Sequence, residues 1–258
     1  MWLSTIPTHF NGSVLGNDEF QDALRLRYMK VPNNLPSKCD GCNADFSVGH
    51  AHQCKKGGLV TRRHDEINYE LSNLMRLAFK KSVVRAEPRI FNGSPATNSE
   101  NDSPTIDESG ERGDLLVRGF WENGMDAIID VRVVDTDAKS YNSRDPASVL
   151  KTAEKSKKNK YLEHCLQQRR AFTPFVVSVD GLLGYEASNL LKRLAFHLSE
   201  KWQKPYSVTC GFVKSRVSLA CVRATHQCLR GSRTPFHSIS REIQWEDGAG
   251  TGLYRIDR

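Results

Sequence analysis

The stretch GDLLVRGFWENGMDAIIDVRV, residues 113–133, has the pattern of a β-hairpin. In its second half, apolar residues occupy every second position, as in a strand with one packed face. A short apolar run follows Asp114, and the turn-forming segment Trp121–Gly124 separates the two runs. We therefore expect two adjacent strands that bring Asp114 near Asp130, with the second face of the hairpin presenting charge.

Asp114 and Asp130 could share a divalent cation. Mg²⁺ and Mn²⁺ prefer oxygen ligands and keep several waters, so two carboxylates and a substrate phosphate can hold such an ion. Hydrolysis of a phosphodiester also needs a group that orients the water and neutralises developing charge. A lysine two residues after the second acid commonly does this, but Arg132 stands there; it can clamp phosphate and cannot act as a base. On spacing alone, the alternative is that the acids face water or pair with a neighbour such as Arg118.

A second candidate site lies in residues 37–58, SKCDGCNADFSVGHAHQCKKGG. Its spacing, C-x2-C-x7-H-x3-C, predicts a small zinc knuckle in which four side chains surround one ion: Cys39, Cys42, His50 and Cys54. His52 is a rival ligand, but a single residue separates it from Cys54, so we prefer His50. The other four of the seven cysteines are expected to be small buried apolar residues, and the odd number argues against a disulfide framework.

The rest of the chain predicts a mixed sheet flanked by helices. The expected order is a helix over 63–80, a strand over 82–91, the hairpin, a helix over 147–170, a strand over 173–179 and a helix over 186–204. In the helix after the hairpin, Lys157 and Lys160 share a face. If that helix crosses the acids, either lysine could supply the missing ammonium; the alternative is a lysine-rich helix facing solvent.

The charge distribution favours a polyanionic partner. The formal charge is +7, and residues 139–170 hold nine Lys or Arg against three acids. Residues 92–112 hold five acids and one base among Asn, Ser, Gly and Pro, which predicts a disordered or extruded loop. No apolar stretch has membrane-spanning length and no signal peptide follows Met1, so we expect a soluble intracellular protein.

Three blocks together resemble the C-terminal region of non-LTR retrotransposons that carry a restriction-like endonuclease behind their reverse transcriptase. The blocks are LPSKCDGCNADFSVGHAHQCKKGGLVTRRH with its CCHC knuckle and Arg-His signature, then EPRIF, GDLLVRGF and DAIIDVRVVD, and then AEKSKKNKY. Further similarity extends through FTPFVVSVDG and CLRGSR. The resemblance covers the chain from Trp2 to about Arg233.

The resemblance implies a restriction-endonuclease-like α/β fold of the PD-(D/E)xK type. In it Asp114 matches the first acid and Asp130 the second, and the catalytic lysine has moved to the next helix at Lys157, with Lys160 close by. The implied activity is Mg²⁺- or Mn²⁺-dependent nicking of target DNA to prime reverse transcription. Implied partners are DNA, element RNA and a reverse transcriptase domain on the same polyprotein, in the nucleus and away from membranes.

The chain departs from this family in two places. Gly113 stands where many such nucleases have proline, and Arg132 stands at the usual lysine position. The division we expect is an N-terminal helical linker region over 1–36, the knuckle over 37–58, the nuclease over 59–235 and a tail over 236–258. The alternative function is a catalytically inactive nucleic-acid-binding remnant of a transposon.

Overall fold

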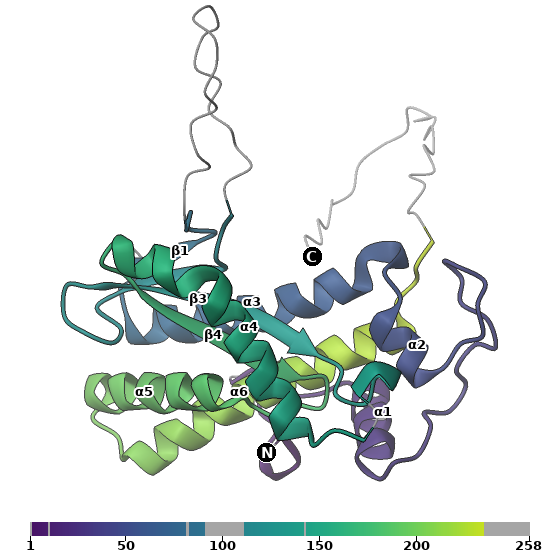
Figure 1. Cartoon of the computed structure of the whole chain (residues 1–258). Coiled ribbons are helices and arrows are strands. Elements are labelled where there is room, and N and C mark those ends of the chain that lie inside the picture. Colours follow the sequence, from purple (N-terminus) through teal and green to yellow (C-terminus); the bar gives the residue numbers. More distant parts are fainter. Residues whose placement is uncertain (1, 10, 81–82, 91–110, 142, 235–258) are drawn as a thin grey trace, which may run out of the picture.

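A four-stranded mixed sheet lies at the centre of the molecule (Figure 1). The computed structural model describes residues 2–9, 11–80, 83–90, 111–141 and 143–234. The strands are β1 (Val84–Ala86), β2 (Leu115–Arg118), β3 (Asp126–Val134) and β4 (Ala171–Ser178), hydrogen-bonded in that order. The first three run antiparallel, whereas β3 and β4 are parallel. The predicted α/β class, with a mixed sheet flanked by helices and an N-terminal Cys-His cluster, is confirmed.

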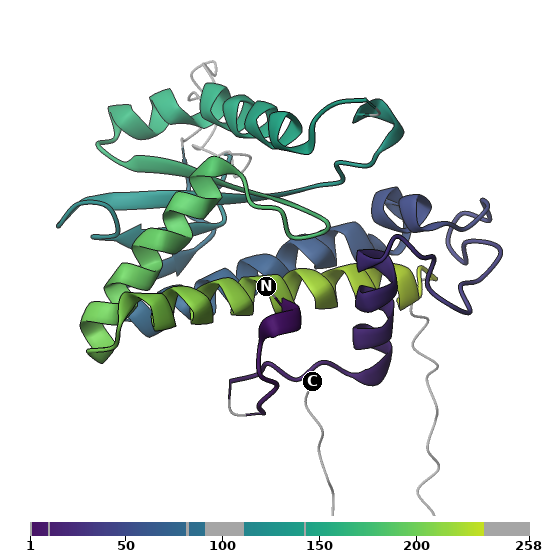
Figure 2. The same ribbon diagram turned by 90° about the horizontal axis from the view of Figure 1, so that it is seen from below.

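The helices form one layer on each side of the sheet, as the view from below shows (Figure 2). Helix α4 (Pro146–Gln167) lies on one face, and the other face carries α3 (Leu59–Ala78), α5 (Tyr185–Trp202) and α6 (Tyr206–Arg230). The N-terminal part holds η1 (Trp2–Ser4) and α1 (Asn17–Arg27), which pack on α6. The remaining short elements are α2 (Val48–Gln53), η2 (Lys56–Gly58) and η4 (Lys139–Tyr141).

The larger core fills the space between the sheet and the three-helix layer. It joins alternate residues of the hairpin, such as Ile129, to apolar stripes of the helices, such as Leu71 and Leu194, all fully buried. Apolar side chains at helical and strand spacing therefore meet in one layer, as the sequence pattern indicates.

The opposite face of the hairpin is also buried, and our expectation that it presents charge was wrong. Ile128 is fully buried there and Asp130 is only 5 % exposed. The reason is the parallel pairing of β3 with β4, which requires a crossover connection. Helix α4 is that crossover, and it covers this face with Tyr161 and its neighbours.

The predicted helices and the other strands lie close to the observed ones, but the strand expected over 82–91 is only the three residues Val84–Ala86, and the short helix α2 was not predicted. The 25-residue helix α6 was not predicted. Its sequence mixes Ser, Thr, Cys and Gly with apolar residues, and such residues have modest helix propensity. Of the four scattered cysteines, three are buried as expected, and Cys210 is only partly buried.

Some of our expectations fall on residues that the structure does not describe. Most of the loop over 92–112 and all of the tail over 236–258 lie outside the described residues. Within the described part of the chain, no helix is both long and apolar enough to cross a membrane.

Candidate functional site

The hairpin places Asp114 and Asp130 just beyond the end of the β2–β3 pairing. That pairing ends with Leu115 opposite Ile129, and each acid is the next residue along its own segment. The Asp114 backbone N–H donates to the Ile129 carbonyl at 3.1 Å, and its Oδ2 accepts from the Val131 N–H at 2.6 Å. The negative charge of Asp114 acts on the carboxyl group of Asp130, so the two acids lie near each other.

Gly113 has a steric reason to be glycine at this place. A Cβ on residue 113 would lie 2.6 Å from Cγ2 of Ile128, and the Gly113 N–H donates to the Pro88 carbonyl at 2.9 Å. A proline would lose that hydrogen bond and meet the same clash. Local packing therefore explains why glycine, and not proline, stands at position 113.

Helix α4 brings Lys157 to the second acid. Its Nζ lies 2.7 Å from Oδ2 of Asp130, and the lysine side chain is 22 % exposed. Burial raises the pKa of Asp130, the charge of Lys157 opposes this rise, and the nearby charge of Asp114 adds to it. A buried carboxylate from β3 and an ammonium from α4 thus form an ion pair, and Asp114, the residue before β2, is near enough for its charge to act on Asp130.

Lys160 and Arg132 occupy different surroundings. Lys160 pairs with Glu111, with 2.6 Å between Nζ and Oε1, and its side chain is 53 % exposed. Arg132 is partly buried on β3 and, among the described residues, has no ion-pair partner. The two lysines that the helix spacing groups together therefore have different ion-pair partners. Lys157 contacts Asp130, and Lys160 contacts Glu111.

Helix α4 is held in place at both its start and its middle. Asp145 caps the helix by accepting from the Ser148 N–H at 2.9 Å, and Pro146 occupies the first turn. One turn before Lys157, the buried Glu154 accepts from the N–H of Glu186 at the start of α5, at 2.9 Å. These contacts fix the register of α4, and with it the position of the Lys157 ammonium.

His64 is a fourth member of this site that our reading of the sequence did not select. It lies in the second turn of α3, with Nε2 3.3 Å from Oδ2 of Asp114 and Nδ1 3.1 Å from Oδ1 of Asp65. The hydrogen bond with Asp114 raises the pKa of His64 to about 9, although burial acts against it. The Arg-His signature contains this residue, but a separation of fifty positions from Asp114 hides the contact.

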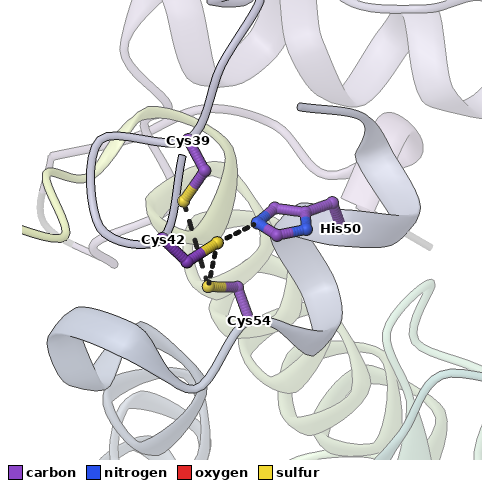
Figure 3. Close-up of side chains that lie close together, drawn as sticks. All are labelled: Cys39, Cys42, His50 and Cys54. Carbon is purple, nitrogen blue, oxygen red and sulfur yellow. Dashed lines mark hydrogen bonds between the residues drawn. The ribbon is translucent and has the colours of Figure 1, made fainter. Parts of the chain in front are cut away.

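The four predicted zinc ligands come together at the other candidate site (Figure 3). Their ligand atoms all lie within 4.8 Å of one another: Cys39, Cys42, His50 and Cys54. The Cys54 sulfur is 3.9 Å from each of the other two sulfurs, and the Cys42 sulfur is 3.4 Å from His50 Nε2. Tetrahedral zinc with Zn–S bonds near 2.3 Å needs sulfurs about 3.8 Å apart. The donor set and its spacing therefore fit a zinc ion.

Local structure explains how these ligands converge. Cys39 and Cys42 lie on one tight turn, closed by the Asn43 N–H to the Cys39 carbonyl at 2.9 Å. Ser47 caps α2 and so orients His50, and Cys54 ends the same helix. Burial acts to raise the pKa of Cys39, but hydrogen bonds from His50 and the neighbouring backbone lower it to about 6, which favours the thiolate that zinc requires.

His52 does not join the cluster, as predicted. Its ring is buried, and burial lowers its pKa to about 4. Among the described residues, the cysteine and histidine cluster is the one group of three or more His, Cys, Asp or Glu side chains arranged to hold a metal.

Comparison with known proteins gives this chain no family. No protein-family model matches the sequence. No curated protein matches it either. The observations that bear on function are therefore the two groups of side chains described above.

Proposed function

We propose that this chain is a metal-dependent DNA endonuclease of the restriction-like type found at the C-terminus of non-LTR retrotransposon polyproteins. The observation that carries the proposal is the approach of Lys157 Nζ to within 2.7 Å of Asp130 Oδ2, with Asp114 near enough for its charge to act on Asp130. Two carboxylates that can hold a divalent ion and a cation beside them are groups that metal-dependent hydrolysis of a phosphodiester can use.

In this proposal Asp114 and Asp130 hold a Mg²⁺ or Mn²⁺ ion. When bound, such an ion supplies charge stabilisation at the scissile phosphate and lowers the pKa of a coordinated water. Lys157 orients the attacking water and balances the charge of Asp130. Arg132, which stays protonated, and Lys160 at the exposed end of the same helix face contact the phosphates on either side.

His64 serves the first acid as an orienting group. The Val131 N–H holds Oδ2 of Asp114 from one side, and the imidazole of His64 approaches the same oxygen from another. In this proposal the other oxygen of Asp114 binds the ion. A carboxylate that is already fixed loses less conformational entropy when an ion binds to it. Lowering that cost is the usual role of such supporting contacts.

The partner in this proposal is DNA, with element RNA as a second nucleic acid and a reverse transcriptase domain on the same polyprotein. Exposed lysines follow the outer face of α4 near the acids, among them Lys151 and Lys155. Lys55 and Lys56 are exposed beside the zinc ligands. Phosphate contacts of this kind give affinity without sequence preference. The proposed place of action is the nucleus.

The proposal is tested by plasmid nicking in Mg²⁺ or Mn²⁺. Asp130→Asn and Lys157→Met are each expected to reduce the nicking rate by two orders of magnitude or more, since each removes a group acting at the reacting phosphate. Lys192→Met, at an exposed lysine of α5 on the other side of the sheet, is the control and should keep nearly the full rate. Equal nicking by Asp130→Asn and the wild type would remove the assignment.

A second candidate function is a nucleic-acid-binding module without catalysis. It is favoured by one observation: each of the two acids already has a cationic partner from the chain, His64 for Asp114 and Lys157 for Asp130. Such a site is charge-balanced and serves the packing of α3 and α4. Salt-dependent DNA binding, with no metal-dependent nicking of supercoiled, linear or branched DNA, would select this function over the first.

A further inference from the structure

The segment that follows α6 passes through the middle of the zinc-ligand region. Arg233, three residues after the end of α6, is only 3 % exposed. A Cβ on Gly41 would lie 2.7 Å from the Arg233 Cβ, and a Cβ on Gly57 would lie 2.3 Å from the Arg233 Cα. The chain at Arg233 therefore fits between the turn that holds Cys39 and Cys42 and the turn that follows Cys54.

Each part of the knuckle contacts this arginine or its neighbour. In the first turn, Asp40 Oδ2 accepts from the Arg233 N–H at 2.7 Å and from the Ser232 hydroxyl at 2.8 Å. In the loop between Cys42 and His50, the Phe46 ring lies 5.1 Å from the guanidinium carbon. In α2, the Ala51 carbonyl accepts from Arg233 Nη2 at 3.3 Å.

The other contacts of the guanidinium are to α6 itself. Nη2 also donates to the Cys228 carbonyl, and Nη1 donates to the Gly231 carbonyl at 3.3 Å. These carbonyls lie at the C-terminal end of a helix, where they lack partners within the helix. The Arg233 side chain therefore donates hydrogen bonds to carbonyls at the end of α6. Its Nη2 also donates to a carbonyl of α2, the helix that carries His50.

We propose that Arg233 is a positioning residue for the cysteine and histidine centre: it holds the three segments that supply the ligands against α6, so that metal retention depends on it. A metal site that the protein does not organise must be ordered when the ion binds, and that cost lowers the affinity. Arg233 orders the site before the ion binds, since it contacts residues near Cys39, His50 and Cys54. The knuckle is thereby a fixed part of the helical core, and its exposed lysines keep one position relative to the acids.

The test is zinc release from the full chain into excess chelator, followed with a chromogenic zinc indicator. Arg233→Met keeps the length of the side chain and removes its donors, and release should become roughly 10–100-fold faster, the range found for groups that support metal ligands. Arg233→Lys keeps the charge without the fork of donors and should be intermediate. A release rate for Arg233→Met equal to that of the wild type would overturn the proposal.

Arg230 provides the matched control. It lies at the end of the same helix, but its partners lie outside residues 37–58: they are the Asp22 carboxylate of α1, with 2.7 Å from Nη2 to Oδ1, and the carbonyls of Asn33 and Asn34. Arg230→Met should therefore loosen α1 and leave zinc release close to the wild-type rate. If it speeds release as much as Arg233→Met does, a general loosening of the α6 end explains both, and the specific role of Arg233 is lost.

A measurement on the unaltered chain covers the case in which Arg233→Met fails to fold. Coupling is reciprocal, so chelating the metal should free the Arg233 segment just as loss of Arg233 frees the metal. Hydrogen exchange of a peptide spanning residues 228–234 should speed up on chelation, because the Arg233 N–H loses its Asp40 acceptor. Unchanged exchange would refute the proposal. Neither readout involves DNA cleavage, so the endonuclease proposal can fail while this one stands.

Discussion

The pair formed by Asp130 and Lys157 should respond very differently to removal of its two members. The Asp130 side chain is 6 % exposed, whereas that of Lys157 is 22 % exposed. Lys157→Met leaves a buried carboxylate without its cation, and removing one partner of a fully buried pair costs about 3–5 kcal/mol. Because Asp130 can take up a proton and Lys157 is partly in water, we expect a smaller loss, about 1–3 kcal/mol of unfolding free energy at pH 8.

Asp130→Asn should have a small effect or stabilise the fold. It removes a charge that burial already disfavours, and the Lys157 ammonium it leaves behind can reach solvent. A gain in stability together with a loss of the proposed nicking activity would be the usual sign of a residue kept for function and not for folding.

The dependence on pH has a definite sign. The pKa of Asp130 is higher in the folded state than in the unfolded state, so ionisation of this group costs stability as pH rises through its folded pKa. The pKa of Asp130 should rise further in Lys157→Met, and the deficit of this variant should shrink as pH falls and the carboxyl becomes protonated. Urea unfolding at several pH values measures this. An Asp130→Asn loss as large as that of Lys157→Met would refute the reasoning.

Two further predictions concern the supports of the site. His64, with a folded pKa of about 9, contributes its full stabilisation below its unfolded pKa of 6.5 and loses that contribution as pH rises to about 9. The loss of unfolding free energy in His64→Gln should therefore decrease over this interval in urea titrations. A loss that is constant from pH 6 to pH 9.5 would contradict the pairing with Asp114. Gly184→Ala should lower the free energy of unfolding by about 1–3 kcal/mol, because its Cβ would lie 2.2 Å from Glu154 Oε1. Gly211→Ala within α6 is the control: nothing lies within 4 Å of its Cβ, so it should be neutral or raise the free energy of unfolding by up to about 1 kcal/mol. Equal effects would show that Glu154 moves away from the new methyl group.

The sequence alone was sufficient wherever the signal was local. The four candidate zinc ligands fall within one short segment, and their spacing is itself the geometric constraint. The hairpin could be predicted because turn-forming residues separate two apolar runs and the alternation on its second strand is regular, and this pairing leaves Asp114 and Asp130 just beyond its last pair. The candidate lysines could be narrowed to two because both lie on one face of one helix.

Contacts between distant segments were decided by the tertiary structure. The spacing on α4 groups Lys157 with Lys160, but the crossing of the helix over β3 gives one to Asp130 and the other to Glu111. The same crossing buries the hairpin face that alternation assigned to solvent, because the sequence pattern cannot indicate which helix will cover a strand.

His64 and Arg233 mark the limit of sequence reading for the same reason. One meets Asp114 across fifty residues, and the other meets Ala51 across 182. The periodicity of a helix or strand fixes which residues share a face of that element, and it carries no information about the partner that the face will meet. Residue types and local spacing therefore determined the candidate ligands and acids, and only the packing of α3, α4 and α6 decided which side chains support them.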